Sequence, residues 1–119
     1  METVRSLFKE NPVNTKEADR IMCKYPDRIP VIVSRNKNSV TTPELDRYKY
    51  LVPSDLTMGQ FLYVIRKRLN LSPEKALFLF IDNSVVCNAT IIANVYSEFR
   101  DLNDGFLHVV YSCENTFGN

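Results

Sequence analysis

The sequence predicts an α+β domain in which one mixed sheet packs over one main helix. Two observations support this class. After a helical N-terminal part, strand-like and helix-like segments follow in the order ββαβαβ. The 119 residues fit a single domain, and 45% hydrophobic with 24% charged residues is the composition of a folded protein. We therefore expect one domain over residues 1–119.

The N-terminal part predicts two helices separated by Pro12. Residues 4–9 form a short amphipathic stretch, and Asn14 can cap a second helix. The apolar residues of this second helix lie at i, i+3, i+4 and i+7, which is one helix face: Ala18, Ile21, Met22 and Tyr25. Because the residue before a proline disfavours helix, Pro26 ends the helix near Tyr25.

Two strands follow, joined by a polar loop over residues 36–44. Residues 28–35 are rich in β-branched side chains, and both faces of this strand are apolar, so we expect it to be covered on both sides. Pro30 cannot donate to a strand ladder, which places it at the start of the strand or on a free edge. Residues 48–52 form the second strand of the hairpin.

The clearest helix begins after Thr57, which can cap it together with Gln60. Its apolar residues repeat at helical spacing: Met58, Phe61, Leu62, Ile65 and Leu69. Residues 77–81 then predict a strand followed by a turn at Asp82 and Asn83. Thr90 can cap a short helix, and residues 106–111 are the last strand, which makes a sheet of four strands.

Several function classes are disfavoured. Fifteen basic against fourteen acidic residues argue against binding nucleic acid through bulk charge. His108 is the only histidine and lies in the middle of a predicted strand, and Cys23, Cys87 and Cys113 contain no CxxC pair, so we expect neither a catalytic site nor a metal site. No segment reaches the ~20 apolar residues of a membrane span, which favours a cytoplasmic protein.

The second strand is the first candidate for a binding function. Lys49 and Leu51 point to one face of the sheet, Tyr50 and Val52 to the other, and Pro53 ends the strand. Lysine and proline protect an exposed sheet edge from pairing. The same edge can also be held open for a partner strand. Both interpretations remain open.

The C-terminal Gly118-Asn119 is the second candidate. A glycine near the end of a tail suits chemistry at its carboxyl group, because without a Cβ it can enter a narrow active site. A frayed tail is the simpler interpretation.

Five stretches together resemble the autophagy ubiquitin-like modifiers, the family of the GABA-type-receptor-associated protein and microtubule-associated light chain 3. They are KYPDRIPVIV (24–33), YLVPSDLTMGQF (50–61), IRKRLNL (65–71), DGFLHVVYS (104–112) and the terminal Phe-Gly. The resemblance implies a ubiquitin-like β-grasp fold with two additional N-terminal helices. Residues 1–26 would be a helical extension, 27–112 the ubiquitin-like body and 113–119 a flexible tail.

The resemblance also implies a non-enzymatic role in autophagy. A cysteine protease would cleave between Gly118 and Asn119. Activating and conjugating enzymes would then transfer Gly118 to phosphatidylethanolamine, the only cofactor-like group expected, and the protein would move from the cytoplasm to the autophagosomal membrane. A soluble peptide-binding adaptor that is never conjugated is the alternative, and a small RNA-binding module is a third, less favoured one.

The resemblance further implies a groove for receptors and autophagy machinery that carry aromatic-x-x-aliphatic (LIR-type) motifs. The pocket for the aromatic residue would be lined by Glu17, Ile21, Pro30, Ile32, Lys49, Leu51 and Phe106. The pocket for the aliphatic residue would be lined by Tyr50, Val52, Pro53, Leu56, Phe61, Val64 and Ile65. Arg28, Arg47 and Arg68 would meet acidic residues that flank the motif, whereas Phe78 and Phe80 belong either to a second contact surface or to the core.

Overall fold

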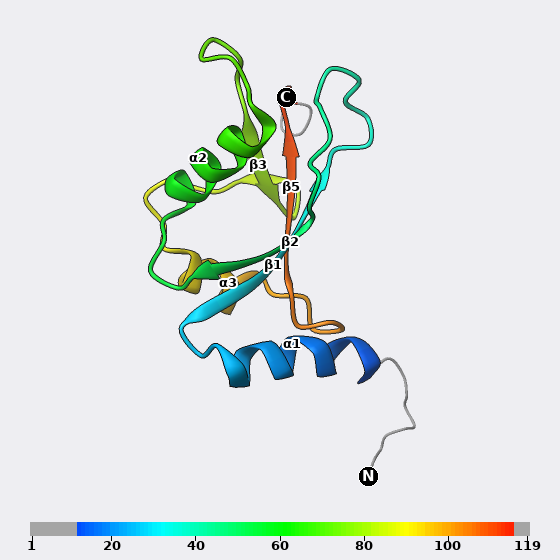
Figure 1. Cartoon of the computed structure of the whole chain (residues 1–119), viewed down its shortest axis with the longest axis vertical. Coiled ribbons are helices and arrows are strands. Elements are labelled where there is room, and N and C mark those ends of the chain that lie inside the picture. Colours follow the sequence, from blue (N-terminus) through cyan, green and yellow to red (C-terminus); the bar gives the residue numbers. More distant parts are fainter. Residues whose placement is uncertain (1–11, 116–119) are drawn as a thin grey trace.

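The computed structural model describes residues 12–115, with side chains from Glu17 onward. In this part of the chain there are three helices and five strands (Figure 1): α1 Pro12–Lys24, β1 Arg28–Arg35, β2 Lys49–Pro53, α2 Met58–Leu69, β3 Phe78–Ile81, β4 Ser84–Val85, α3 Ile92–Phe99 and β5 Leu107–Ser112. The predicted helix over residues 4–9 and the terminal Gly118-Asn119 lie outside the described residues.

The sheet has the strand order β2-β1-β5-β3-β4, with β1 and β5 parallel and the other pairs antiparallel. The predicted number of four strands is therefore wrong by one. Asp82 and Asn83 have φ angles of 52° and 65°, and they turn the chain back so that β4 pairs with the end of β3. Positive φ at both central residues is the geometry of a tight hairpin. A two-residue strand carries too short a pattern to be seen in the sequence.

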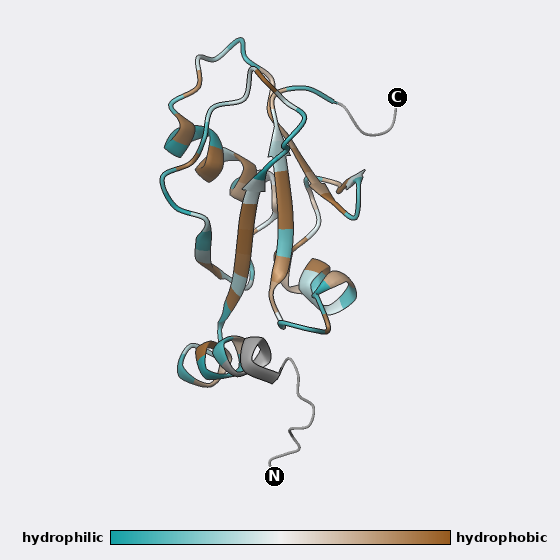
Figure 2. Ribbon diagram, turned by 90° about the vertical axis from the view of Figure 1, so that its right-hand side faces the viewer, coloured by the Kyte–Doolittle hydropathy of each residue, from teal (hydrophilic) through white to brown (hydrophobic). Residues whose placement is uncertain are grey.

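The core lies between the sheet and α2. Val31, Ile65, Leu107 and Val109 are completely buried there, in a cluster that extends over β1, α2, β3, α3 and β5. Figure 2 shows hydrophobic residues running along the strands. The opposite face of β1 is also covered, because Pro30 is fully buried. The prediction that this strand is enclosed on both sides is confirmed.

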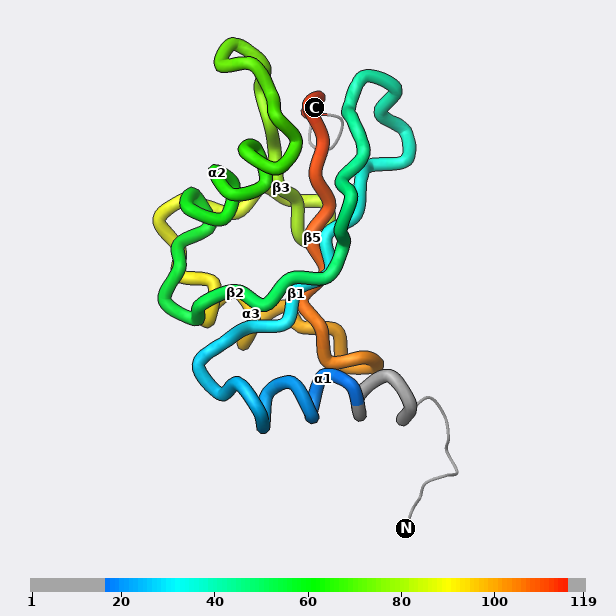
Figure 3. Tube along the Cα trace, in the orientation of Figure 1, coloured from blue at the N-terminus to red at the C-terminus, as the bar shows by residue number. Residues whose placement is uncertain are grey.

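Helix α1 lies across the end of the sheet, where the turn that precedes β5 also lies (Figure 3). The contact is close: a Cβ added to Gly105 would lie 2.9 Å from the Cβ of Ala18. Gly105 also has a φ of 77°, a backbone conformation that residues other than glycine rarely adopt. The turn before β5 and α1 thus form one packed unit beside β1.

Helix α1 begins at Pro12 rather than after Asn14, so the prediction that Asn14 caps it is wrong. Proline suits the first helical position because its missing N–H would have no partner there. The helix ends at Lys24, just before Tyr25-Pro26, as predicted.

The capping predictions for the other two helices have opposite outcomes. Thr57 Oγ1 accepts from the Gln60 N–H at 3.1 Å and Gln60 Oε1 accepts from the Thr57 N–H at 2.9 Å, so the predicted capping box of α2 is confirmed. Thr90 does not cap α3, whose N-cap is Ile91 and has no side-chain hydrogen bond. The carbonyls of Leu56 and Ser54 instead accept from the first amides of α3, at 2.7 and 3.1 Å. Tertiary contact here replaces a local cap.

Candidate functional site

Strand β2 forms one edge of the sheet, as predicted. One side of the strand pairs with β1, in a register that runs from Arg28 opposite Pro53 to Ile32 opposite Lys49. In the part of the chain that the structure describes, no strand pairs with the other side. An edge of this kind presents backbone N–H and C=O groups with which an extended segment can pair.

A cavity of about 380 Å³ lies beside this edge, where α1, β2, α2 and the start of β5 meet. Its lining includes four of the seven residues predicted for the aromatic pocket, Ile21, Lys49, Leu51 and Phe106, together with Arg47, Tyr50 and Arg68. Phe106 is 4% exposed and forms part of the floor, whereas Leu51 is 38% exposed and reaches the rim. The cavity therefore combines an apolar base with a basic rim.

Lys49 connects the two walls of this cavity. Its Nζ lies 2.7 Å from Glu17 Oε2 on α1 and 5.7 Å from the centre of the Phe106 ring. The hydrogen bond with Glu17 raises the pKa of Lys49 above its ordinary value. Because both side chains are well exposed, the ion pair is a weak constraint that an incoming side chain can displace.

The remaining two residues predicted for the aromatic pocket lie beneath it. Pro30 is opposite Leu51 and Ile32 is opposite Lys49 in the β1–β2 register, so each pair shares one face of the sheet. Pro30 is fully buried and Ile32 is half-buried. All seven predicted residues thus lie on one face of the sheet or on the helix and turn that cover it.

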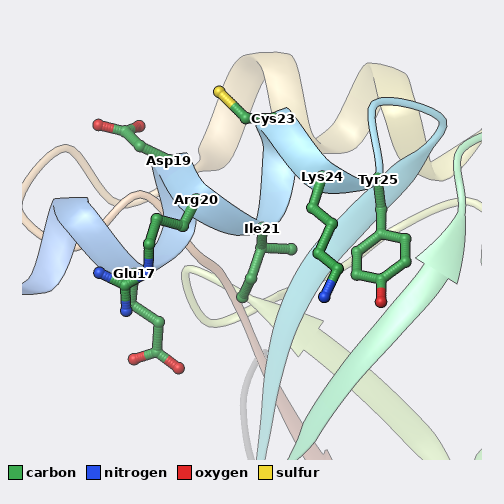
Figure 4. Close-up of a pocket in the computed structure, with 7 residues that line it drawn as sticks. All are labelled: Glu17, Asp19, Arg20, Ile21, Cys23, Lys24 and Tyr25. Carbon is green, nitrogen blue, oxygen red and sulfur yellow. The ribbon is translucent and has the colours of Figure 1, made fainter.

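A second cavity, of about 800 Å³, runs along α1 and shares Ile21 with the first cavity. Its lining is Glu17, Asp19, Arg20, Ile21, Cys23, Lys24 and Tyr25 (Figure 4). Figure 4 shows Ile21 and Tyr25 on the side of the helix toward the strands, and Asp19 and Cys23 on the other side. The sequence indicated the apolar helix face that carries Ile21 and Tyr25, but not a cavity beside it, since the other residues of the lining are mostly charged.

The residues predicted for the aliphatic pocket divide by exposure. Val52, Phe61 and Ile65 are core residues. Tyr50 and Leu56 are half-buried, and the rings of Tyr50 and Phe61 meet edge to face with centres 6.1 Å apart. Pro53 and Val64 are exposed. The accessible surface is thus a shallow strip between β2 and α2 supported by buried side chains, and its use as a pocket stays a prediction.

The three predicted flanking arginines are placed differently. Arg47 and Arg68 line the first cavity, and the Arg68 guanidinium lies 5.6 Å from the centre of the Tyr50 ring and 3.5 Å from Asp46 Oδ1. Burial raises the pKa of the Tyr50 phenol, and Arg68 opposes this shift. Arg28 is exposed at the start of β1, opposite Pro53 at the other end of the edge. The cavity extends around the edge of β2 and so also includes Tyr50, Arg47 and Arg68 beside Lys49. The sequence did not predict this shared lining.

His108 lies on the exposed face of β5, with Nε2 2.7 Å from Asp104 Oδ2. Asp104 Oδ1 also accepts from the Phe106 N–H at 2.9 Å, and Asp101 Oδ1 accepts from the Asn103 N–H at 2.7 Å. The potential ligand atoms of Asp101, Asp104 and His108 lie within 4.8 Å of one another, a grouping not anticipated from the sequence. The hydrogen bonds order the turn that holds Phe106 in the cavity floor.

The remaining chemical features are few. Cys23, Cys87 and Cys113 are free thiols. None of the described helices combines the length and apolar character needed to cross a bilayer.

The family of the chain follows from a comparison with known proteins. A family model described as autophagy protein Atg8, ubiquitin-like, matches residues 13–118. The chain belongs to the Atg8 family. Its relatives include autophagy-related protein 8d of Arabidopsis thaliana, 53% identical over 97% of this chain and 96% of the relative. Autophagy-related protein 8 of Coccidioides immitis is 52% identical over 98% of this chain and all of the relative.

A solved structure of an Atg8 protein has the same fold. The crystal structure of Trypanosoma brucei ATG8 superposes with a TM-score of 0.82 at 40% sequence identity, and the match covers 99% of this chain and 100% of that one. The predicted resemblance and the ubiquitin-like α+β fold are therefore confirmed. The chain is an autophagy ubiquitin-like protein.

Proposed function

We propose that this Atg8-family chain is a non-enzymatic modifier that becomes joined to a membrane lipid and recruits proteins through the β2 edge. The observation that supports this most is the match to the Atg8 family over residues 13–118, which includes the glycine near the C-terminus. The free edge of β2 and the adjacent cavity support the recruiting role independently.

Recruitment proceeds by addition of a peptide strand to β2. The aromatic residue of an aromatic-x-x-aliphatic motif enters the cavity above Phe106 and displaces Lys49 from Glu17. The aliphatic residue lies on the strip between β2 and α2, near Val64. Acidic residues beside the motif meet Arg47 and Arg68, or Arg28. Two apolar contacts with strand hydrogen bonds suit a micromolar Kd, about −8 kcal/mol.

Attachment uses the carboxyl group of Gly118. A cysteine protease hydrolyses the peptide bond between Gly118 and Asn119 and so frees the glycine carboxylate. An activating enzyme first uses a nucleoside triphosphate to convert this carboxylate into an acyl nucleotide, with release of pyrophosphate, and an enzyme thiol then displaces the nucleoside monophosphate to form a thioester. The amine of phosphatidylethanolamine finally displaces the thiol of the conjugating enzyme to form an amide. One acyl chain holds a protein weakly on a bilayer, whereas two chains hold it firmly. The protein then changes from a cytoplasmic to an autophagosomal location.

Intact-mass measurement of the protein from starved and fed cells tests this proposal. We expect the loss of Asn119 in both, and in starved cells an additional form heavier by one phosphatidylethanolamine. Persistence of Asn119 in starved cells would contradict the proposal.

A soluble adaptor that binds peptides but is never conjugated is the second candidate. It is favoured by the fact that the groove is built entirely from residues upstream of the tail. The variant Gly118→Ala separates the two functions, because under conjugation it abolishes the membrane-bound form while peptide binding is unchanged. An adaptor would keep its distribution in cells.

A further inference from the structure

The loop over residues 36–44 makes an unusual polar contact with the end of β5. Four polar residues of the described chain are buried, Asn36, Ser39, Thr42 and Ser112, and all four lie at this contact. We define the loop–tail contact as these four residues with Thr41, Cys113 and Glu114. Buried polar groups are costly unless hydrogen-bonded, so their gathering at one place indicates a specific arrangement.

The hydrogen bonds of the contact continue beyond the end of the sheet. The Asn36 N–H donates to the Tyr111 carbonyl at 2.9 Å, next to the last β1–β5 pair. Strand β5 ends at Ser112, yet the Cys113 N–H donates to Thr42 Oγ1 at 2.8 Å. Thr41 Oγ1 donates to the Glu114 carboxylate. The loop therefore holds two residues that the sheet no longer holds.

Other bonds keep the loop itself in place. The hydroxyl of Thr42 also forms a hydrogen bond with the hydroxyl of Ser39, and Arg35 Nη1 donates to the Ser39 carbonyl. On the far side of the loop, the Tyr111 hydroxyl donates to the Pro43 carbonyl and accepts from the Leu45 N–H, both at 2.9 Å. Thr42 is thus the central group, since it joins the loop to the first residue after β5.

This arrangement determines how far the reactive glycine can travel. Gly118 lies four residues beyond Glu114, so an extended tail held at Glu114 reaches about 14 Å. A tail held only at Ser112 would reach about 21 Å. A longer tether lowers the effective concentration of its end at a fixed point roughly as the −3/2 power of length, and it gives the exit direction more freedom.

We propose that Thr42 is a positioning residue that orients the C-terminal tail for the enzymes acting on Gly118. This inference rests on the proposed function. Thr42 acts on the tail through the Cys113 N–H, which donates to its Oγ1. Loss of the hydrogen bond between Thr42 and Cys113 leaves the start of the tail held less firmly, so a processing enzyme must order more of the chain when it binds.

The test compares the full-length chain with Thr42→Val, which keeps the shape but removes the acceptor, and with Thr42→Ser, which keeps the hydroxyl. Cleavage after Gly118 by the processing cysteine protease is followed by mass spectrometry. We expect Thr42→Val to raise KM about two- to fivefold, with kcat changed less than twofold and with recovery in Thr42→Ser. Ile92→Val, a conservative core change in α3, controls for a general loss of stability and leaves KM unchanged.

Amide hydrogen exchange provides the second readout. We expect exchange at the Cys113 amide to be at least tenfold faster in Thr42→Val, and exchange in α2 to be unchanged. An unchanged KM in Thr42→Val despite faster exchange overturns the positioning role. Equal exchange rates at Cys113 in the wild-type chain and in Thr42→Val would show that Thr42 does not restrain the tail. If the wild-type chain is not cleaved after Gly118, the proposed function fails, whereas the exchange result still decides whether Thr42 restrains the tail.

Discussion

At the scale of single residues, the candidate groove depends on side chains that alternate along β2. Lys49 and Leu51 face the cavity floored by Phe106, whereas Val52 enters the core. Period-two alternation made these two faces predictable from the sequence. The position of Phe106 was not predictable in this way, because it depends on the turn that Asp104 orders and on Gly105 packing against Ala18. It was inferred only from the family resemblance.

Leu51→Ala is expected to weaken the binding of a synthetic peptide that has an aromatic-x-x-aliphatic core preceded by acidic residues. The loss of contact at the cavity rim should cost about 1–3 kcal/mol, or roughly a fivefold to 150-fold rise in Kd. Isothermal titration calorimetry measures this change. Leu102→Ala is the matched control, because Leu102 is 83% exposed outside the cavity lining. Equal Kd values for the two variants would place the groove elsewhere.

At the scale of secondary-structure elements, the sequence predicted a helix start correctly where the hydrogen bonds that fix it are made by neighbouring residues. The capping box of α2 was evident because Thr57 and Gln60 satisfy each other's backbone amides. Helix α3 gave a misleading signal at Thr90, because the amides that open it are satisfied by carbonyls from the segment between β2 and α2. Such a partner is distant in sequence, and a local pattern contains no trace of it.

The two helix starts therefore provide a matched pair of variants. Thr57→Ala should lower the free energy of unfolding by about 0.5–2 kcal/mol, because the cap of α2 is lost. Thr90→Ala should change it much less, since its side chain makes no cap. Urea denaturation followed by circular dichroism measures both. A larger loss in Thr90→Ala than in Thr57→Ala would show that the caps are assigned wrongly.

At the scale of the whole molecule, three tyrosines connect separate parts of the fold. Tyr50 lies under Arg68, Tyr96 donates to the Gly105 carbonyl, and Tyr111 donates to the Pro43 carbonyl. Burial raises the pKa of all three above the ordinary 10.0. The unfolded chain therefore releases these protons at lower pH than the native protein does.

This linkage predicts that the protein loses stability as the pH rises above about 10, because the native state then binds more protons than the unfolded state. Below that pH the three phenols are protonated in both states and contribute no slope. Urea denaturation at a series of pH values from 8 to 11 measures the effect. Tyr111→Phe should flatten the slope, and an identical slope in that variant would exclude Tyr111 as a contributor.

The overall architecture was the most predictable feature, since patterns of period two and 3.6 cover most of the chain. What escaped prediction is either too short to carry a pattern or arises where distant segments meet. Strand β4 is one example, of the first kind, because its two residues are recognisable only from their pairing with Phe80 and Ile81. The cluster of Asn36, Ser39 and Thr42 is another: these residues are typical of a surface loop, yet the structure buries them against the end of β5.

The two edge strands of the sheet differ in length, since β2 has five residues and β4 has only two. A border of two residues is a poor template for another chain, and natural proteins use short strands of this kind to prevent uncontrolled stacking. Addition of a strand to this sheet is therefore favoured at β2, which is the edge that the proposed peptide would use.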